Sequence, residues 1–510
     1  MKSLIAKIIL ATGACFLLVN GLSAQHWLGT TLSNQNVTNS AIVNPATLGA
    51  AKNKVFVNVA GFGFNVINDY ISWGAPFTIQ SYLRGNVDGQ YKDSNGAINF
   101  QNNWLAQNLN GENKNLYFET EVRGPAAMIR LSKKSAISFG VRSRTAFSFT
   151  NVSENLAKFA VNGLDTTTVS SNTQVNIGDN LDNLRLRANA LSFQEYSLSF
   201  GKQFFEVKNF KIKLGATAKL LMGNAYIYAQ GDDIDFTVNG LDSVDIRAAD
   251  FRYGYSDLNN FQDFSPNSLI PSAGGDFGWD AGAVVEYNPK VGENLRNKST
   301  RYLVKAGISL MDMGSITFKN AVSNKVRLNA PFTFVADSNA TAAVQDGPFS
   351  DRAIEFGDSI VDAYFTVDRS SRVIYRLPSM LSIQLDYNIF KGFYLGALWF
   401  QDIRGVDLDK ISINRPSQVT LMPRWESNLV EASLPIILNG DYKVLQVGGF
   451  VILGPVFAGS DNLLALITQE NFYGVNAYFG IATGIGKNKQ KKEKEDKEAM
   501  LLFSKDFGIY

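Results

Sequence analysis

The chain has almost no cysteine and almost no histidine, with one of each in 510 residues. Cys15 lies in a segment that we expect to be removed, so the mature chain would have neither a disulfide nor a cysteine-ligated metal. His26 would be the second mature residue, and we expect it to be exposed rather than to act as a general base. Since acid–base and zinc chemistry usually need histidine, we predict that the protein is no enzyme and holds no cofactor or metal.

Long hydrophobic runs are also missing, except near the start. MKSLIAK carries two lysines, IILATGACFLLV is too short to span a bilayer, and GLSA ends in small residues. This order predicts a signal peptide at 1–24, cut after Ala24, with an N-terminal membrane anchor as the alternative. No later window approaches eighteen apolar residues, which excludes membrane-spanning helices, so only a closed β-barrel could still cross a membrane.

Charge of either sign is scarce and nearly balanced, with 48 basic and 46 acidic residues. Loss of Lys2 and Lys7 with the signal peptide would leave 46 of each, so nothing indicates a nucleic-acid partner. Acidic runs at 232–235, 407–409 and 493–496 lie in expected loops or in the tail, and we interpret them as solvated.

Alternating residues give the main evidence for strands. In 136–150, 211–222 and 380–389, apolar side chains take every second position, and the positions between them hold polar, charged or small residues. This period of two is expected when one face meets lipid and the other meets water, although a soluble β-sandwich would show it too. Repetition along the whole chain, together with aromatic residues near strand ends, favours the barrel.

The spacing of turns and loops predicts the size of the barrel. Short turns at 132–135, 206–209, 390–392 and 438–441 alternate with long polar stretches near 68–114, 152–189, 231–275 and 319–370. About twelve strands are expected, and a further hairpin at 233–256 would give fourteen: 54–66, 115–131, 136–150, 190–206, 210–230, 277–290, 300–318, 371–389, 392–404, 418–434, 442–455 and 472–486. We therefore predict an all-β fold, a single transmembrane antiparallel β-barrel over 54–486 with about 14 strands (alternatively 12).

Two segments lie outside this pattern. Residues 25–53 are rich in Asn, Thr and Ala without strand alternation, and they contain Asn44, Pro45 and Ala46. Residues 487–510 begin with a mixed-charge run, and we expect a solvated periplasmic tail there.

Three features together resemble the FadL-like outer-membrane proteins. They are the signal peptide, the segment NSAIVNPATLGAAKNKVFVNVAGFGF at 39–64, and the ending VGGFVILGPVFAGSDNLLAL with GVNAYFGIATGIGK. The chain is most similar to a Bacteroidota branch related to the PorV-type barrels of the type 9 secretion system. The resemblance implies a fourteen-stranded barrel with 25–53 folded into the lumen as a hatch; a disordered periplasmic leader is the alternative reading of this segment. It also implies a sideways exit at a kinked strand, for which Gly124 and Pro125 are the candidates; a plain bulge is the alternative.

Six charged residues should face the lumen by parity within their strands. They either form lumenal salt bridges or line a selective path: Arg142, Arg144, Glu195, Lys213, Lys219 and Asp386. The leading hypothesis is a FadL-like barrel in the Gram-negative outer membrane that passes small molecules, with hydrophobic ones as candidates. The alternative is a non-transporting accessory of a secretion or surface-assembly machine. The expected partners are outer-membrane lipid, a hydrophobic small molecule, or secretion-system components.

Overall fold

The computed structural model describes residues 27–49, 51–94, 96–99, 104–162, 164–165, 174–240, 242–256, 275–289, 302–335, 351–390, 392–404, 411–427, 429–468 and 473–485. The predicted signal peptide, Cys15, His26 and the predicted tail at 487–510 lie outside these residues. No helix in the described part of the chain is long and apolar enough to cross a membrane.

One large sheet of twenty strand segments dominates the molecule. It closes on itself where β1 (Val55–Asn68) pairs antiparallel with β24 (Gly474–Ile485), which makes it a barrel. The other ring segments are β4 (Lys114–Arg130), β5 (Ser135–Val152), β8 (Asn180–Val207), β9 (Phe210–Val238), β10 (Ser243–Tyr255), β11 (Asp276–Tyr287), β12 (Val304–Leu328), β14 (Phe365–Arg376), β15 (Met380–Phe390), β16 (Phe393–Asp402), β18 (Gln418–Glu426), β19 (Val430–Ser433), β20 (Ile436–Asn439), β21 (Val444–Val447), β22 (Gly449–Leu453) and β23 (Val456–Ser460).

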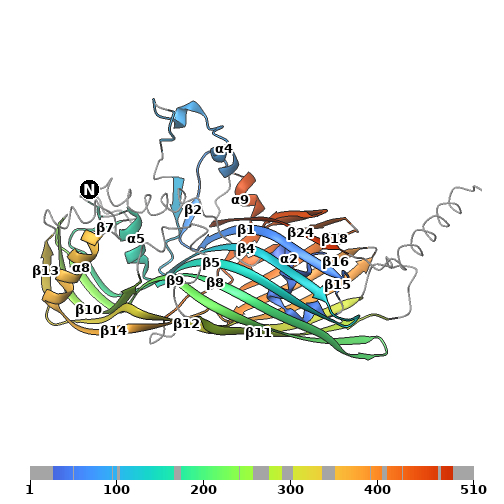
Figure 1. Cartoon of the computed structure of the whole chain (residues 1–510). Helices are drawn as coiled ribbons and strands as arrows, with labels where there is room; N and C mark the ends of the chain where they lie inside the picture. Colours follow the sequence, from blue (N-terminus) through green and yellow to red (C-terminus); the bar gives the residue numbers. More distant parts are fainter. Residues whose placement is uncertain are drawn as a thin grey trace, which may run out of the picture.

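These segments occupy fourteen positions around the ring, as predicted. Four positions hold two consecutive segments each, namely β10 with β11, β14 with β15, β19 with β20, and β21 with β22. The short β13 (Phe332–Val335) and β17 (Ile411–Ser412) lie outside the ring. The fold is therefore all-β, a closed antiparallel barrel (Figure 1).

The two strands beyond the expected twelve are not those predicted. The two additional strands are β23 and the strand formed by β19 and β20. The predicted hairpin at 233–256 adds no separate strand to the ring: its first half extends β9, and its second half, β10, occupies the same ring position as β11. Pro435 separates β19 from β20. Only two residues, 454–455, separate β22 from β23, which makes β23 difficult to recognise as a separate strand in the sequence. The turn near 438–441 also lies at the end of the barrel that carries the long loops, opposite the short turns at 132–135, 206–209 and 390–392.

The predicted faces of the strands are confirmed. On β15, Ile383, Leu385 and Tyr387 are exposed on the outside, while Gln384 and Asp386 are buried inside. β5 and β9 alternate in the same way. The outer surface of the barrel is therefore largely apolar and its inner surface polar, the arrangement expected of a barrel in lipid.

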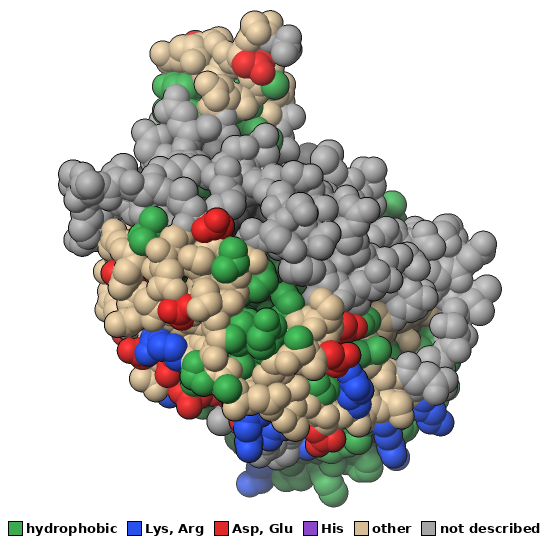
Figure 2. All heavy atoms as spheres, turned by 90° about the vertical axis from the view of Figure 1, so that its left-hand side faces the viewer, with side chains coloured by type: hydrophobic (Ala, Val, Ile, Leu, Met, Phe, Trp, Pro, Cys, Tyr) green, Lys and Arg blue, Asp and Glu red, His purple; other side chains and the backbone are tan. Residues whose placement is uncertain are grey.

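Several strands are far longer than a membrane requires. β8 has 28 residues, β9 has 29 and β12 has 25, whereas about 9–11 residues cross a bilayer. With β10, β13, β14 and helix α8 (Asp351–Tyr364) they form a curved sheet beyond the barrel, at the left in Figure 1. Acidic and basic side chains are interspersed on the described part of this end, with a hydrophobic patch between them (Figure 2).

The remaining elements belong to the long-loop end. They are β2 (Ile71–Trp73), α4 (Ile79–Leu83), η2 (Gly89–Tyr91), β3 (Leu105–Gln107), α5 (Glu154–Asn162), β6 (Leu164–Asp165), β7 (Val175–Asn176) and α9 (Leu463–Ile467). The first four form a small aromatic-cored projection (Figure 1).

Candidate functional site

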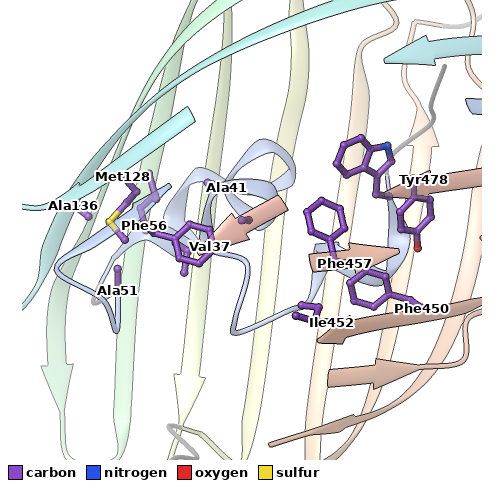
Figure 3. Close-up of a cluster of buried hydrophobic side chains, with 13 residues drawn as sticks. Val37, Ala41, Ala51, Phe56, Met128, Ala136, Phe450, Ile452, Phe457 and Tyr478 are labelled. Atoms are coloured by element: carbon purple, nitrogen blue, oxygen red, sulfur yellow. The ribbon is translucent and has the colours of Figure 1, made fainter. Parts of the chain in front are cut away.

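The N-terminal segment lies inside the barrel. It consists of α2 (Leu28–Thr31), α3 (Val37–Val43) and η1 (Pro45–Leu48), and nearly every described residue of it is buried. In Figure 3, Val37 and Ala41 of α3 lie beside Phe56 and Met128, and the cluster continues to aromatic side chains of other strands. We call residues 27–49 the plug.

Asn44 anchors the plug to three strands at once. Its Oδ1 accepts a hydrogen bond from the Ala46 backbone N–H at 3.1 Å, which starts η1, and Pro45 occupies the first turn. Its Nδ2 donates to the carbonyl oxygens of Ala283 and Ile308 at 3.2 and 3.3 Å, and to Gln384 Oε1 at 3.4 Å.

A row of glycines receives this motif on the inner wall. Gly201 of β8 lies opposite Gly215 of β9, which lies opposite Gly282 of β11. A Cβ at Gly215 would lie 2.3 Å from the Pro45 carbonyl carbon, and one at Gly282 would lie 2.2 Å from Asn44 Oδ1. Only glycine allows the backbone of the plug to come this close to the wall. The sequence pattern did not reveal this row, although its glycines occupy lumen-facing positions of successive strands.

Other plug residues contact the short-turn end of the lumen. Ser33 Oγ donates to Glu431 Oε2 at 2.8 Å, Asn34 Nδ2 donates to Glu426 Oε2 at 2.9 Å, and Arg424 Nη1 donates to the Leu32 carbonyl at 2.7 Å. Arg424 also pairs with Asp386 at 2.6 Å, both fully buried. The plug is therefore held by charged side chains as well as by the glycine row.

A layer of ion pairs crosses the lumen next to the plug. Its ten members are all buried and comprise five acids and five bases: Glu119, Glu121, Arg123, Arg142, Arg144, Glu195, Lys219, Asp280, Asp312 and Arg415. We call this set the ion-pair layer. Because the layer holds equal numbers of acids and bases, each buried charge can lie beside an opposite charge. An unpaired charge in the same place would be energetically costly.

Asp312 of β12 lies at the centre of the ion-pair layer. It meets Lys219 Nζ at 2.7 Å, Arg144 Nη1 at 2.9 Å and Arg415 Nη1 at 3.3 Å. Because Arg144 belongs to β5, which does not neighbour β12 in the ring, this contact spans the lumen.

The ladder between β1 and β4 is interrupted beside the plug. Asn58 of β1 pairs with Ala126 of β4, and Gly61 pairs with Arg123, so Val59 and Ala60 face Gly124 and Pro125 without ladder pairing. The register between β4 and β5 also shifts between Arg123 and Ala126. Pro125 has no N–H to donate, which suits a break in the ladder.

A small cavity of about 30 Å³ lies directly behind this interruption. Asn39 of α3 forms one side, and Asn58, Arg123 and Gly124 form the side toward the wall. Further lining comes from serine and threonine hydroxyls and from charged members of the ion-pair layer. The cavity therefore joins the plug, the layer and the interrupted wall.

The structure places all six predicted lumen-facing charges inside the barrel, and each is in an ion pair. Arg142, Arg144, Glu195 and Lys219 belong to the ion-pair layer, Asp386 pairs with Arg424, and Lys213 pairs with Glu286 at 2.5 Å. Six members of the ion-pair layer were not among the predicted residues: Glu119, Glu121, Arg123, Asp280, Asp312 and Arg415. Arg415 lies just before β18, in a stretch without strand alternation. Among the described residues, no group of acidic, histidine or cysteine side chains could hold a metal.

Comparison with solved structures finds distant similarity to barrels of the FadL type. A TodX monoaromatic hydrocarbon channel mutant is 10% identical, with 88% of this chain and 94% of that one covered and a TM-score of 0.37. A Pseudomonas aeruginosa FadL homologue is 10% identical over 89% and 95%, with a TM-score of 0.35. The Ralstonia pickettii toluene transporter TbuX is 9% identical over 92% and 100%, with a TM-score of 0.36.

No curated protein matches the sequence. The model of a family of unknown function, DUF5723, matches residues 45–461. This match begins at Pro45 of the plug, ends just after β23, and covers most of the chain. The protein belongs to the DUF5723 family.

Proposed function

We propose that this chain is an outer-membrane β-barrel that passes small molecules, hydrophobic ones in particular, sideways through its wall beside Gly124 and Pro125. The plug and the ion-pair layer occupy the lumen along its axis, so the lateral route is the more accessible one. A molecule that leaves through the wall enters hydrocarbon, which favours hydrophobic molecules over ions.

Several features support the outer-membrane location. The outside of the barrel is largely apolar, and its strands are antiparallel and even in number. The long loops lie at one end, and the short turns at 132–135, 206–209 and 390–392 lie at the other. A cleavable signal peptide at 1–24 and a periplasmic tail at 487–510 are part of the same proposal.

The observation that carries the proposal is the coincidence of the interrupted ladder with the cavity. Gly124 belongs to both, since it faces β1 without ladder pairing and also lines the cavity. A small separation of β1 from β4 at this point would therefore join the cavity to the outside without breaking a continuous ladder.

The variant Gly124→Leu tests this route. A Cβ at Gly124 meets only ordinary contacts, the nearest being the Val141 carbonyl oxygen at 3.4 Å, so the side chain can be accepted. It would extend beside Val141, which lines the cavity together with Gly124, and would narrow the space at the interrupted ladder. We expect uptake of the hydrophobic dye N-phenyl-1-naphthylamine by expressing cells to fall to the rate of cells without the protein.

The matched control is Gly89→Leu in the projecting loop, where a Cβ meets nothing within 4 Å. With equal amounts of both variants in the outer membrane, Gly89→Leu should take up dye like the parent. Undiminished uptake by Gly124→Leu would refute the lateral route.

A second candidate function is a non-transporting barrel that serves a secretion or surface-assembly machine, which is what the sequence resemblance to PorV-type barrels implies. The curved sheet beyond the barrel, with α8 packed on it, is the observation in its favour, because transport alone does not need strands of this length. If the parent protein adds no dye uptake at all, this candidate is preferred.

A further inference from the structure

The cavity behind Gly124 contains polar side-chain atoms that have no partner in the protein. Asn39 and Asn58 are at most 2% exposed, and in both residues the amide nitrogen and the amide oxygen lack a hydrogen bond. Burying such groups unpaired is costly, and native proteins keep few of them. Two unsatisfied carboxamides that line one cavity therefore indicate a site built to bind something.

Arg123 adds a third unpartnered group. Its Nε and Nη2 donate to Glu121 at 2.9 and 3.2 Å, and its guanidinium stacks 3.5 Å from the centre of the Trp27 ring. These contacts hold the side chain rigidly and leave Nη1 without an acceptor. The cavity thus offers one fixed guanidinium donor beside two carboxamides, each of which can donate and accept.

The surrounding charges favour an uncharged occupant. The ion-pair layer holds five acids and five bases, so an added carboxylate or ammonium would be an uncompensated charge in a buried place. A volume of about 30 Å³ has room for roughly one to three waters, so it can accept only a compact polar group.

We propose that this cavity binds the uncharged polar head group of a small amphipathic molecule, a group such as a primary amide that both donates and accepts hydrogen bonds. The head group bonds with Asn39, Asn58 and Arg123 Nη1, and the apolar part points through the interrupted wall past Gly124. This inference rests on the proposed function and specifies its substrate class.

Calorimetric titration of the full mature protein in detergent micelles tests the proposal with three ligands of equal chain length. Hexanamide is expected to bind, and hexanoate and hexylammonium to bind at least about tenfold more weakly, since one unpaired charge costs more than 1.4 kcal/mol. Equal binding of all three would overturn the choice of head group.

Two variants locate the site. Asn58→Leu and Asn39→Leu should each weaken hexanamide binding about tenfold or more. Asn65→Leu is the matched control, because Asn65 is also a buried asparagine of β1 but does not line the cavity. Equal losses in Asn58→Leu and Asn65→Leu would show that the cavity is not the site.

A thermal melt without ligand separates a binding role from a structural one. Because the Asn58 amide has no partner in the protein, Asn58→Leu should melt at the parent temperature or above it. A clear drop, together with lost binding, would mean that the amide supports the fold and would contradict the proposal. Binding in micelles does not require passage, so dye uptake and hexanamide binding can fail independently.

Discussion

Asparagine in place of Asp312 is expected to lower the free energy of unfolding by about 3–5 kcal/mol, the cost of leaving buried charges without their partner. Three cations, Lys219, Arg144 and Arg415, contact this carboxylate within 3.3 Å. The variant leaves five bases against four acids in the ion-pair layer. Unfolding by denaturant from lipid vesicles measures the change.

The Asp312→Asn substitution isolates charge from backbone conformation. Asp312 has a φ of 54°, a left-handed conformation that asparagine adopts as readily as aspartate. Glu206→Gln serves as the control, because Glu206 pairs with Lys134 at 3.7 Å with both side chains largely exposed. That pair should contribute less than about 1 kcal/mol. Similar losses in the two variants would mean that the ion-pair layer is not a dry, interdependent network.

Alanine at Gly215 should release the plug from the wall. The new Cβ would lie 2.3–2.5 Å from backbone atoms of Pro45 and Ala46, and the backbone cannot yield as a flexible side chain can. Overpacking of this kind costs about 1–3 kcal/mol. Local opening of the plug should therefore rise roughly tenfold to a hundredfold, measured as faster amide exchange over Val37–Leu48.

Gly357→Ala in α8 is the matched control for Gly215→Ala. Its Cβ meets nothing within 4 Å, and alanine in a helix is favoured over glycine by about 0.5–1 kcal/mol. We expect this variant to be slightly more stable and its plug to exchange at the parent rate. Gly215→Ala would disprove the close docking of Asn44-Pro45-Ala46 if it behaved the same way.

Much of the barrel could be predicted because each strand carries its own evidence. The period of two along 380–389 assigns Leu385 to the outside and Asp386 to the inside without knowledge of any neighbour. The same parity turns Arg142 and Glu195 inward, although parity alone does not predict that the two side chains form an ion pair at 2.6 Å. Gly124 and Pro125 predicted a bulge, because proline has no backbone N–H to donate to the neighbouring strand.

What could not be predicted depends on contacts between distant parts of the chain. Asn44 bonds to residues 239, 264 and 340 positions away, and nothing local selects those acceptors. The partners of Asp312 come from β5, β9 and the segment before β18, so pairing follows from closure of the ring. The β19–β20 position was missed since Pro435 divides it into two four-residue segments, too short to show alternation.

The proposed route through the wall requires that residues 27–49 form a plug fixed within the lumen. Amide hydrogen exchange of the mature protein in lipid vesicles tests it most directly. The Ser40 and Asn44 N–H groups donate to the Asn36 and Ser40 carbonyls inside the barrel, and Gly49 N–H donates to Ala46. We expect these amides to exchange as slowly as those of the barrel strands; exchange at the rate of an unfolded peptide would contradict a plug fixed in the lumen.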